Sequence, residues 1–65
     1  GLAAYRAIIA ALPRLLASDG LCVLELGIGQ ADAVCGLTKD AGLSVKALRR
    51  DLGGVERALA LGRLS

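Results

Sequence analysis

The stretch V-L-E-L-G-I-G-Q-A-D-A, residues 23–33, decides how this chain folds. An apolar run ends in Glu25, and Gly27 and Gly29 follow with one residue between them. Residues 21–26 are nearly all apolar and have no helical period, which predicts a strand buried on both faces, as in a parallel sheet. The glycines after it predict a tight turn into a helix.

The residues before this stretch predict an amphipathic helix. From Leu2 to Leu16 the large apolar residues recur mostly at every third position, with single steps between, so they form one stripe. Pro13 lies inside the pattern and costs about 3 kcal/mol in a helix interior, so we expect a kink or a break into two short helices near Leu12. Residues 18–20, Ser-Asp-Gly, predict the turn that follows.

The residues after the stretch predict one more helix and two more strands. The helix begins near residue 30 or 31, has Asp32 in its first turn and ends at Gly42. Residues 44–50 and 55–61 then predict two strands, with a hairpin-like connection at the Gly-Gly pair between them. The predicted element order is α-β-α-β-β.

The predicted topology leaves part of the sheet uncovered. A right-handed crossover makes the first two strands parallel, and the last strand then runs antiparallel, either at an edge or between the other two. If the first helix also belongs to a right-handed crossover, both helices cover the same sheet face. The other face and one edge of the strand at residues 21–26 are then bare, which indicates part of something larger.

The predicted core is aliphatic. Its members in the second helix and the three strands are Leu24, Leu26, Val34, Leu37, Val45, Leu48, Leu59 and Leu61. The first helix adds Ile8, Ile9, Leu12, Leu15 and Leu16.

Composition narrows the classes of protein. A chain of 65 residues forms one domain at most and buries only about 60% of its unfolded surface. Neither a signal peptide nor a membrane span fits the sequence. With one aromatic residue, Tyr5, and a net charge of only +2, we expect neither nucleic acid nor a membrane as a partner. Cys22 and Cys35 are thirteen positions apart and no histidine is present, which predicts two buried thiols in a reducing cytoplasm rather than a metal site.

The Gly-x-Gly turn has three interpretations. A dinucleotide loop would place a third glycine where Asp32 stands, and that acid would repel a pyrophosphate. A methyltransferase loop fits better, with Glu25, Gly27 and Gly29 in register, but it needs an acid after the next strand to hold the ribose. Asp51 is the candidate there, and the fourteen residues after it are too few for the rest of an enzyme.

The third interpretation is a plain turn. Glycines let a buried strand enter a helix without steric cost. Glu25 is then a half-buried acid, for which Arg49 or Arg57 on a neighbouring strand is the candidate partner.

Three motifs together resemble a known family. G-L-x-x-Y-R-x-I (residues 1–8), L-E-L-G-I-G-Q-A (24–31) and R-R-D-L-G-G-V-E-R (49–57) closely resemble the C-terminal end of the bacterial release-factor glutamine methyltransferases, the PrmC/HemK family. The resemblance runs over essentially all 65 residues. It implies an enzyme that methylates the glutamine of the Gly-Gly-Gln motif in peptide-chain release factors, with S-adenosylmethionine as the methyl donor.

The resemblance also implies a fold and a role. Residues 1–65 would be a single α/β fragment, the α-β-α-β-β C-terminal part of a Rossmann-like methyltransferase sheet, with the last strand antiparallel between the other two. The family's cofactor loop and its Asn-Pro-Pro-Tyr motif both lie upstream, so no catalytic, cofactor-binding or metal-binding residue is carried over to this chain. The fragment would then be a scaffold without catalytic activity of its own, and its partners would be the rest of the methyltransferase domain and, through it, release factors.

Two other functions remain open from the residues alone. The bare strand edge and sheet face would suit a self-associating interaction module. The turn with Glu25, Gly27 and Gly29 would suit a minimal cofactor-binding half-domain.

Overall fold

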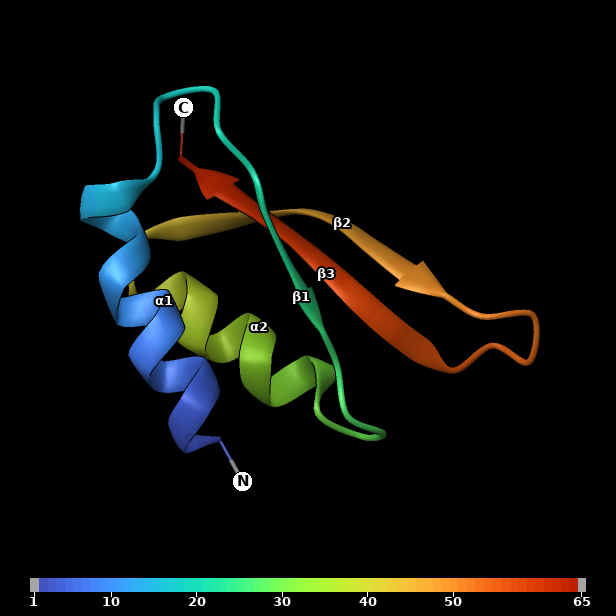
Figure 1. Cartoon of the computed structure of the whole chain (residues 1–65). Coiled ribbons are helices and arrows are strands. Elements are labelled where there is room, and N and C mark those ends of the chain that lie inside the picture. Colours follow the sequence, from blue (N-terminus) through green and yellow to red (C-terminus); the bar gives the residue numbers. More distant parts are fainter. Residues whose placement is uncertain (1, 65) are drawn as a thin grey trace.

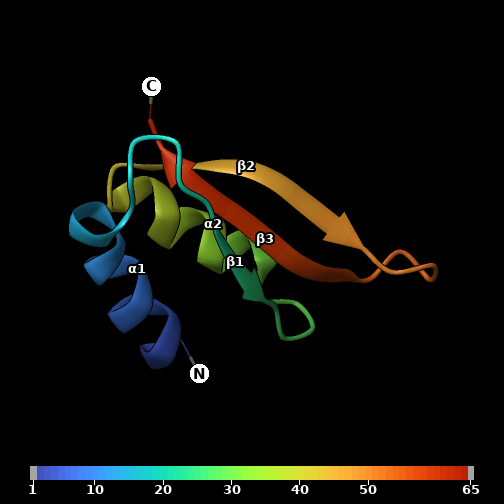
Figure 2. The same cartoon turned by 45° about the horizontal axis from the view of Figure 1, so that its top comes forward.

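The computed structural model describes residues 2–64 and has two layers, helices on one side and a sheet on the other (Figures 1 and 2). The element order is α1 (Ala3–Leu15), β1 (Cys22–Glu25), α2 (Ala31–Asp40), β2 (Leu43–Arg50) and β3 (Glu56–Arg63). This order confirms the predicted α-β-α-β-β pattern. Gly1, the first residue of the family motif, lies outside the described residues.

Helix α1 continues through Pro13. The expected break into two short helices near Leu12 is wrong, because Pro13 stands in the last turn, where its missing N–H removes a single bond. The Leu16 N–H still donates to the Leu12 carbonyl at 2.9 Å. Arg63 on β3 supports this helix end, since its guanidinium donates to the carbonyl of Leu16 at 2.8 Å and to that of Pro13.

The sheet has the order β1-β3-β2, and β3 is antiparallel to both neighbours. The residues alone had left the last strand either at an edge or in the middle, and the structure places it in the middle. Strands β1 and β2 therefore run parallel to each other without touching, and β1 forms one edge of the sheet (Figure 1).

The register separates the side chains into two faces. Leu24, Leu59 and Leu48 form one row across the sheet, on the face that the helices cover. Val23, Ala60 and Ala47 form a row on the opposite face. Both helices lie on the first side, so no helix within residues 2–64 covers the opposite face, as the sequence predicted (Figure 2).

Strand β1 corrects one expectation. It is buried on one face only, because Leu24 is 8% exposed while its neighbour Val23 is 66% exposed. The strand pairs with an antiparallel partner and has helices on one side, so its unbroken apolar sequence does not reflect burial on both faces within this chain.

Glycines lie at the end of the second helix and in the turn of the hairpin, as expected. Gly42 follows α2 with φ +76° and donates its N–H to the Lys39 carbonyl. Gly54 has φ +84° in the turn between β2 and β3. The hairpin formed by these two strands projects beyond the helices (Figure 1).

The core lies between the helices and the sheet, and Val34, Leu59 and Leu61 are fully buried in it. Two predicted members are wrong: Ile8 and Leu15 face solvent, because α1 packs mainly against α2 and buries a narrower stripe than the sequence suggested. Leu16, Leu37, Val45 and Leu48 are only partly buried. Two members were missed, Ala31 and Leu43.

Neither helix within residues 2–64 has the length and apolar character needed to cross a membrane.

Candidate functional site

The turn between β1 and α2 carries the residues that suggested a cofactor loop. Gly29 has φ +77°, a conformation that side chains rarely adopt, so glycine is required there for the chain to turn. At Gly27 a Cβ would lie 2.5 Å from Oε1 of Gln30, so a larger residue there would displace the Gln30 side chain from its present position. The Gln30 N–H donates to the Gly27 carbonyl at 3.1 Å, and α2 begins one residue later. Residues 27–30 are thus a tight turn, as the third interpretation predicted.

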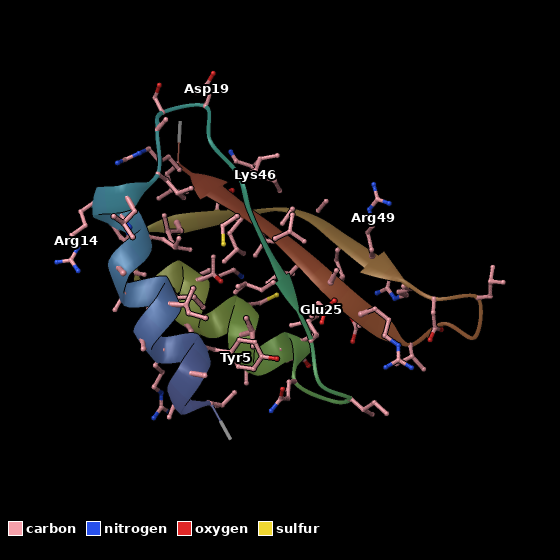
Figure 3. The ribbon with its side chains drawn as sticks, viewed as in Figure 1. Tyr5, Arg14, Asp19, Glu25, Lys46 and Arg49 are labelled. Carbon is pink, nitrogen blue, oxygen red and sulfur yellow. The ribbon has the colours of Figure 1, made fainter. Side chains whose placement is uncertain are left out.

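The backbone N–H of Gly27 is already bonded within the chain. It donates to the Tyr5 hydroxyl at 3.2 Å and to Oε1 of Gln30 at 3.2 Å. The Tyr5 hydroxyl in turn donates to the Glu25 carbonyl at 2.9 Å. Figure 3 shows Tyr5 on α1 reaching toward the end of the strand that carries Glu25. A ligand that accepts a hydrogen bond from the Gly27 N–H would have to displace these partners. Sequence reasoning did not anticipate the bonds to Tyr5, because Tyr5 is about twenty residues away.

The Glu25 side chain does not behave as predicted. It is exposed rather than half-buried, and within residues 2–64 it forms no salt bridge. Ala58 on β3 lies directly opposite Glu25, and Arg49 lies on the far side of Ala58, so β3 separates the acid from that arginine. Arg57 forms its salt bridge with Asp51 instead. The expected pairing of Glu25 with either arginine is therefore wrong.

Asp51, the candidate ribose-binding acid, holds the hairpin turn. Its Oδ1 accepts hydrogen bonds from the N–H of Gly53 at 2.9 Å and of Val55 at 3.0 Å. Its Oδ2 accepts from Nε of Arg57 at 3.0 Å. The bond from the Val55 N–H is the largest of the effects that lower the pKa of Asp51, and the bond from Arg57 is the next. All these partners lie within six residues, so this acid stabilises its own turn.

The remaining charges and thiols are at the surface or partly buried. Arg50 and Glu56 form an exposed pair across the hairpin at 3.4 Å. Cys22 and Cys35 are free and only partly buried, which corrects the expectation of two buried thiols. Within residues 2–64 no pocket was found, and no cluster of side chains there could hold a metal ion.

No family model matches the chain. Curated relatives do match it. The release factor glutamine methyltransferase of Rhodospirillum rubrum is 43% identical over 63 residues, which is 97% of this chain and 19% of the relative. The enzyme of the same name from Cereibacter sphaeroides is 42% identical over 60 residues, 92% of this chain and 22% of the relative. The chain thus spans about a fifth of the length of the curated relatives it matches.

A solved structure has the same fold. The protein-(glutamine-N5) methyltransferase, release factor-specific, of Alicyclobacillus acidocaldarius superposes with a TM-score of 0.77 and 35% identity. The superposition covers 100% of this chain and 42% of that chain. Fold and matches together define an α/β segment of a Rossmann-like methyltransferase sheet. More particularly, the chain is homologous over nearly its whole length to the C-terminal segment of the release factor glutamine methyltransferases. This confirms the resemblance found in the sequence.

Proposed function

We propose that residues 1–65 form the C-terminal structural part of a methyltransferase that modifies the Gly-Gly-Gln glutamine of peptide-chain release factors. The observation that carries the proposal is the match of 92–98% of this chain to four enzymes named release factor glutamine methyltransferase. The methyl donor would be S-adenosylmethionine, bound by residues upstream of this segment. The enzyme would act in the cytoplasm, where it meets release factors.

The role of this segment would be to complete the sheet that holds the cofactor and substrate loops. Two structural features support this role. The outer edge of β1 has no strand beside it within residues 2–64, and one face of the sheet carries exposed apolar side chains, with Leu21 61% and Val23 66% exposed. Unpaired edges and apolar patches are typical of surfaces that another part of a protein covers. The isolated segment would be inactive, because it spans only about a fifth of the length of the enzymes that it matches.

The test is methyl transfer by the whole protein that carries this segment. The purified protein is incubated with S-adenosylmethionine and a release factor, and the Gly-Gly-Gln peptide is examined by mass spectrometry. We expect one added methyl group on the glutamine with the whole protein. We expect none with the 65-residue chain or with the protein shortened to end just before residue 1. An unmodified glutamine with the whole protein would contradict the enzymatic function, and full activity of the shortened protein would contradict the scaffolding role.

A second candidate function is self-association, which the same bare edge of β1 favours. A second copy could pair with the edge and extend the sheet, as unprotected edge strands do. Sedimentation of the 65-residue chain at several concentrations distinguishes self-association from the scaffolding role. A monomer at every concentration would remove self-association as a candidate.

The cofactor-binding half-domain stays a prediction. Titration of S-adenosylmethionine into the 65-residue chain, followed by the amide shifts of Gly27 and Gly29, would test it. Unchanged shifts would end this hypothesis.

A further inference from the structure

The turn between β2 and β3 presents one leucine to solvent. Leu52 is fully exposed, whereas the next most exposed large apolar side chain within residues 2–64, Ile28, is 77% exposed. The hairpin that carries Leu52 projects beyond both helices (Figures 1 and 2). A single exposed leucine is ordinary on a protein surface, but turns are usually built from glycine, proline and small polar residues. The packing of residues 2–64 therefore does not account for a leucine at this position.

The other residues of the turn hold it in one conformation. The Asp51 N–H donates to the Val55 carbonyl at 2.9 Å, and the Gly54 N–H donates to the Asp51 carbonyl at 3.0 Å. The Asp51 carboxylate also accepts from the N–H groups of Gly53 and Val55. Leu52 takes part in none of these bonds and lies at the tip that they fix. A turn that is already ordered loses little conformational entropy when its tip binds a partner.

The hairpin around Leu52 carries a net positive charge. Residues 49–57 contain three arginines and two acids. Both acids are paired, Glu56 with Arg50 at 3.4 Å and Asp51 with Arg57 at 3.0 Å. Arg49 is exposed on β2 and forms no salt bridge within residues 2–64 (Figure 3). A partner surface that suits this hairpin has an apolar pocket for the leucine and acidic side chains at its rim.

The turn lies beyond the carboxyl ends of the two parallel strands. Strand β1 ends at Glu25, opposite Ala58, and β2 continues to Arg50, opposite Glu56. The hairpin therefore extends past the same end of the sheet as the turn at residues 27–30. Open α/β sheets bind their ligands at this end. A protein substrate that reaches a site there is large enough to contact the hairpin tip as well.

We propose that Leu52 docks into an apolar pocket of the release factor, away from the methylated glutamine, and that Arg49 contacts acidic side chains at the rim of this pocket. The proposal rests on the proposed function, which supplies the protein substrate. A second copy of the chain fits less well, because two identical tips would bring like charges together at a two-fold contact. The hairpin thus binds the substrate and takes no part in methyl transfer.

The first test measures binding of the whole protein to immobilised release factor without the methyl donor. Leu52→Ser should raise the Kd about tenfold to a hundredfold, the range expected when a leucine side chain is no longer buried. Leu15→Ser is the matched control, since Leu15 is 70% exposed and lies on α1, near the amino end of β1. It should leave the Kd within twofold. An unchanged Kd in Leu52→Ser would overturn the proposal.

A thermal melt of the same variants checks whether Leu52 packs inside the enzyme instead. Leu52→Ser should melt at the temperature of the unchanged protein. A lower midpoint in Leu52→Ser, with none in Leu15→Ser, would mean that another part of the enzyme covers the leucine and would overturn the proposal.

The charge is tested with Arg49→Glu. This variant should raise the Kd about threefold to tenfold at low salt and less at high salt, because salt screens exposed charges. Arg14→Glu changes the net charge equally from an exposed position on α1 and is the control. Equal effects of the two variants would refute the acidic rim.

Methyl transfer by the same proteins separates this proposal from the proposed function. With a short peptide that contains Gly-Gly-Gln, Leu52→Ser should keep kcat/KM within twofold of the unchanged protein. An equal loss with the peptide and the intact release factor would place Leu52 at the glutamine and overturn the proposal. A whole protein that binds the release factor through Leu52 but methylates nothing would refute the proposed function and leave the docking site standing.

Discussion

The two faces of the sheet differ in what they contribute. On the helix side, Leu59 and Leu61 are fully buried, and the row of Leu59 across the sheet consists of leucines. On the other side, Val23 is 66% exposed and its row continues through two alanines. The helix side therefore stabilises this segment. The other side contributes little to the stability of the segment and is free to contact another part of the protein. Substitutions on the two faces should separate stability from attachment.

The largest effect is expected at Leu59. Leu59→Ala should lower the free energy of unfolding of the 65-residue chain by about 2–5 kcal/mol, because it leaves a cavity at a fully buried position. At about 0.05–0.15 kcal/mol per residue, a 65-residue domain has about 3–10 kcal/mol of stability, so this loss is a large fraction of the total. Urea denaturation followed by far-UV circular dichroism measures the change. A loss no larger than that of Val23→Ala would contradict the assigned core.

The next effect is expected where α1 meets the sheet. Arg63→Gln removes the guanidinium that bonds to the carbonyls of Leu16 and Pro13 at the negative end of the helix dipole. We expect a loss of about 1–2 kcal/mol by the same urea measurement. Arg49→Gln is the control, since Arg49 is exposed and bonds to no other side chain within residues 2–64. Equal losses in the two variants would show that Arg63 does not hold the helix end.

A smaller effect at Val23 sharpens the comparison of faces. Val23→Thr keeps the shape of the side chain and adds a hydroxyl. In the 65-residue chain the free energy of unfolding should change by no more than about 0.5 kcal/mol, because Val23 is exposed. In the whole protein the free energy of unfolding should fall by about 1–3 kcal/mol if another element covers Val23, because the added hydroxyl would then be buried without a partner. The same small change in both would mean that nothing covers this face.

The smallest effect is expected at Asp51. Its hydrogen bonds lower its pKa in the folded state, so the carboxylate stabilises the hairpin at neutral pH, and this contribution is lost as pH falls through the folded pKa. Below the ordinary value of 3.8, the stability advantage of the wild type over Asp51→Asn should therefore shrink. Urea midpoints measured from neutral pH down to pH 2 test this. A difference that does not depend on pH would indicate that the charge has no role in the turn.

The sequence predicted the elements better than their burial. The spacing of the apolar residues and the turn residues predicted the positions of both helices. Gly27 and Gly29 correctly predicted the turn after β1. Ile8 was misplaced because the apolar stripe of a helix does not reveal how much of it a neighbour covers. The middle position of β3 came from the family resemblance, since hydrophobic pattern and crossover rules allow an edge position as well.

The candidate site was predicted less well because it depends on contacts between distant residues. Glu25 and Arg49 look complementary in the sequence, but the register places Ala58 of the intervening strand between them. The bond from Tyr5 to the end of β1 crosses twenty residues. A lone tyrosine in an otherwise aliphatic segment was the only signal that could have indicated it.

The most direct test of the central claim is amide exchange of Val23 and Glu25 in the whole protein. Val23 and Glu25 lie opposite residues of β3, but their N–H groups point away from β3, toward the outer edge of the sheet. The N–H of Leu24, between them, points toward β3. If the rest of the protein completes the sheet at this edge, the Glu25 amide should exchange as slowly as that of Leu24. Rapid exchange of both the Val23 and Glu25 amides beside a slow Leu24 would contradict the claim.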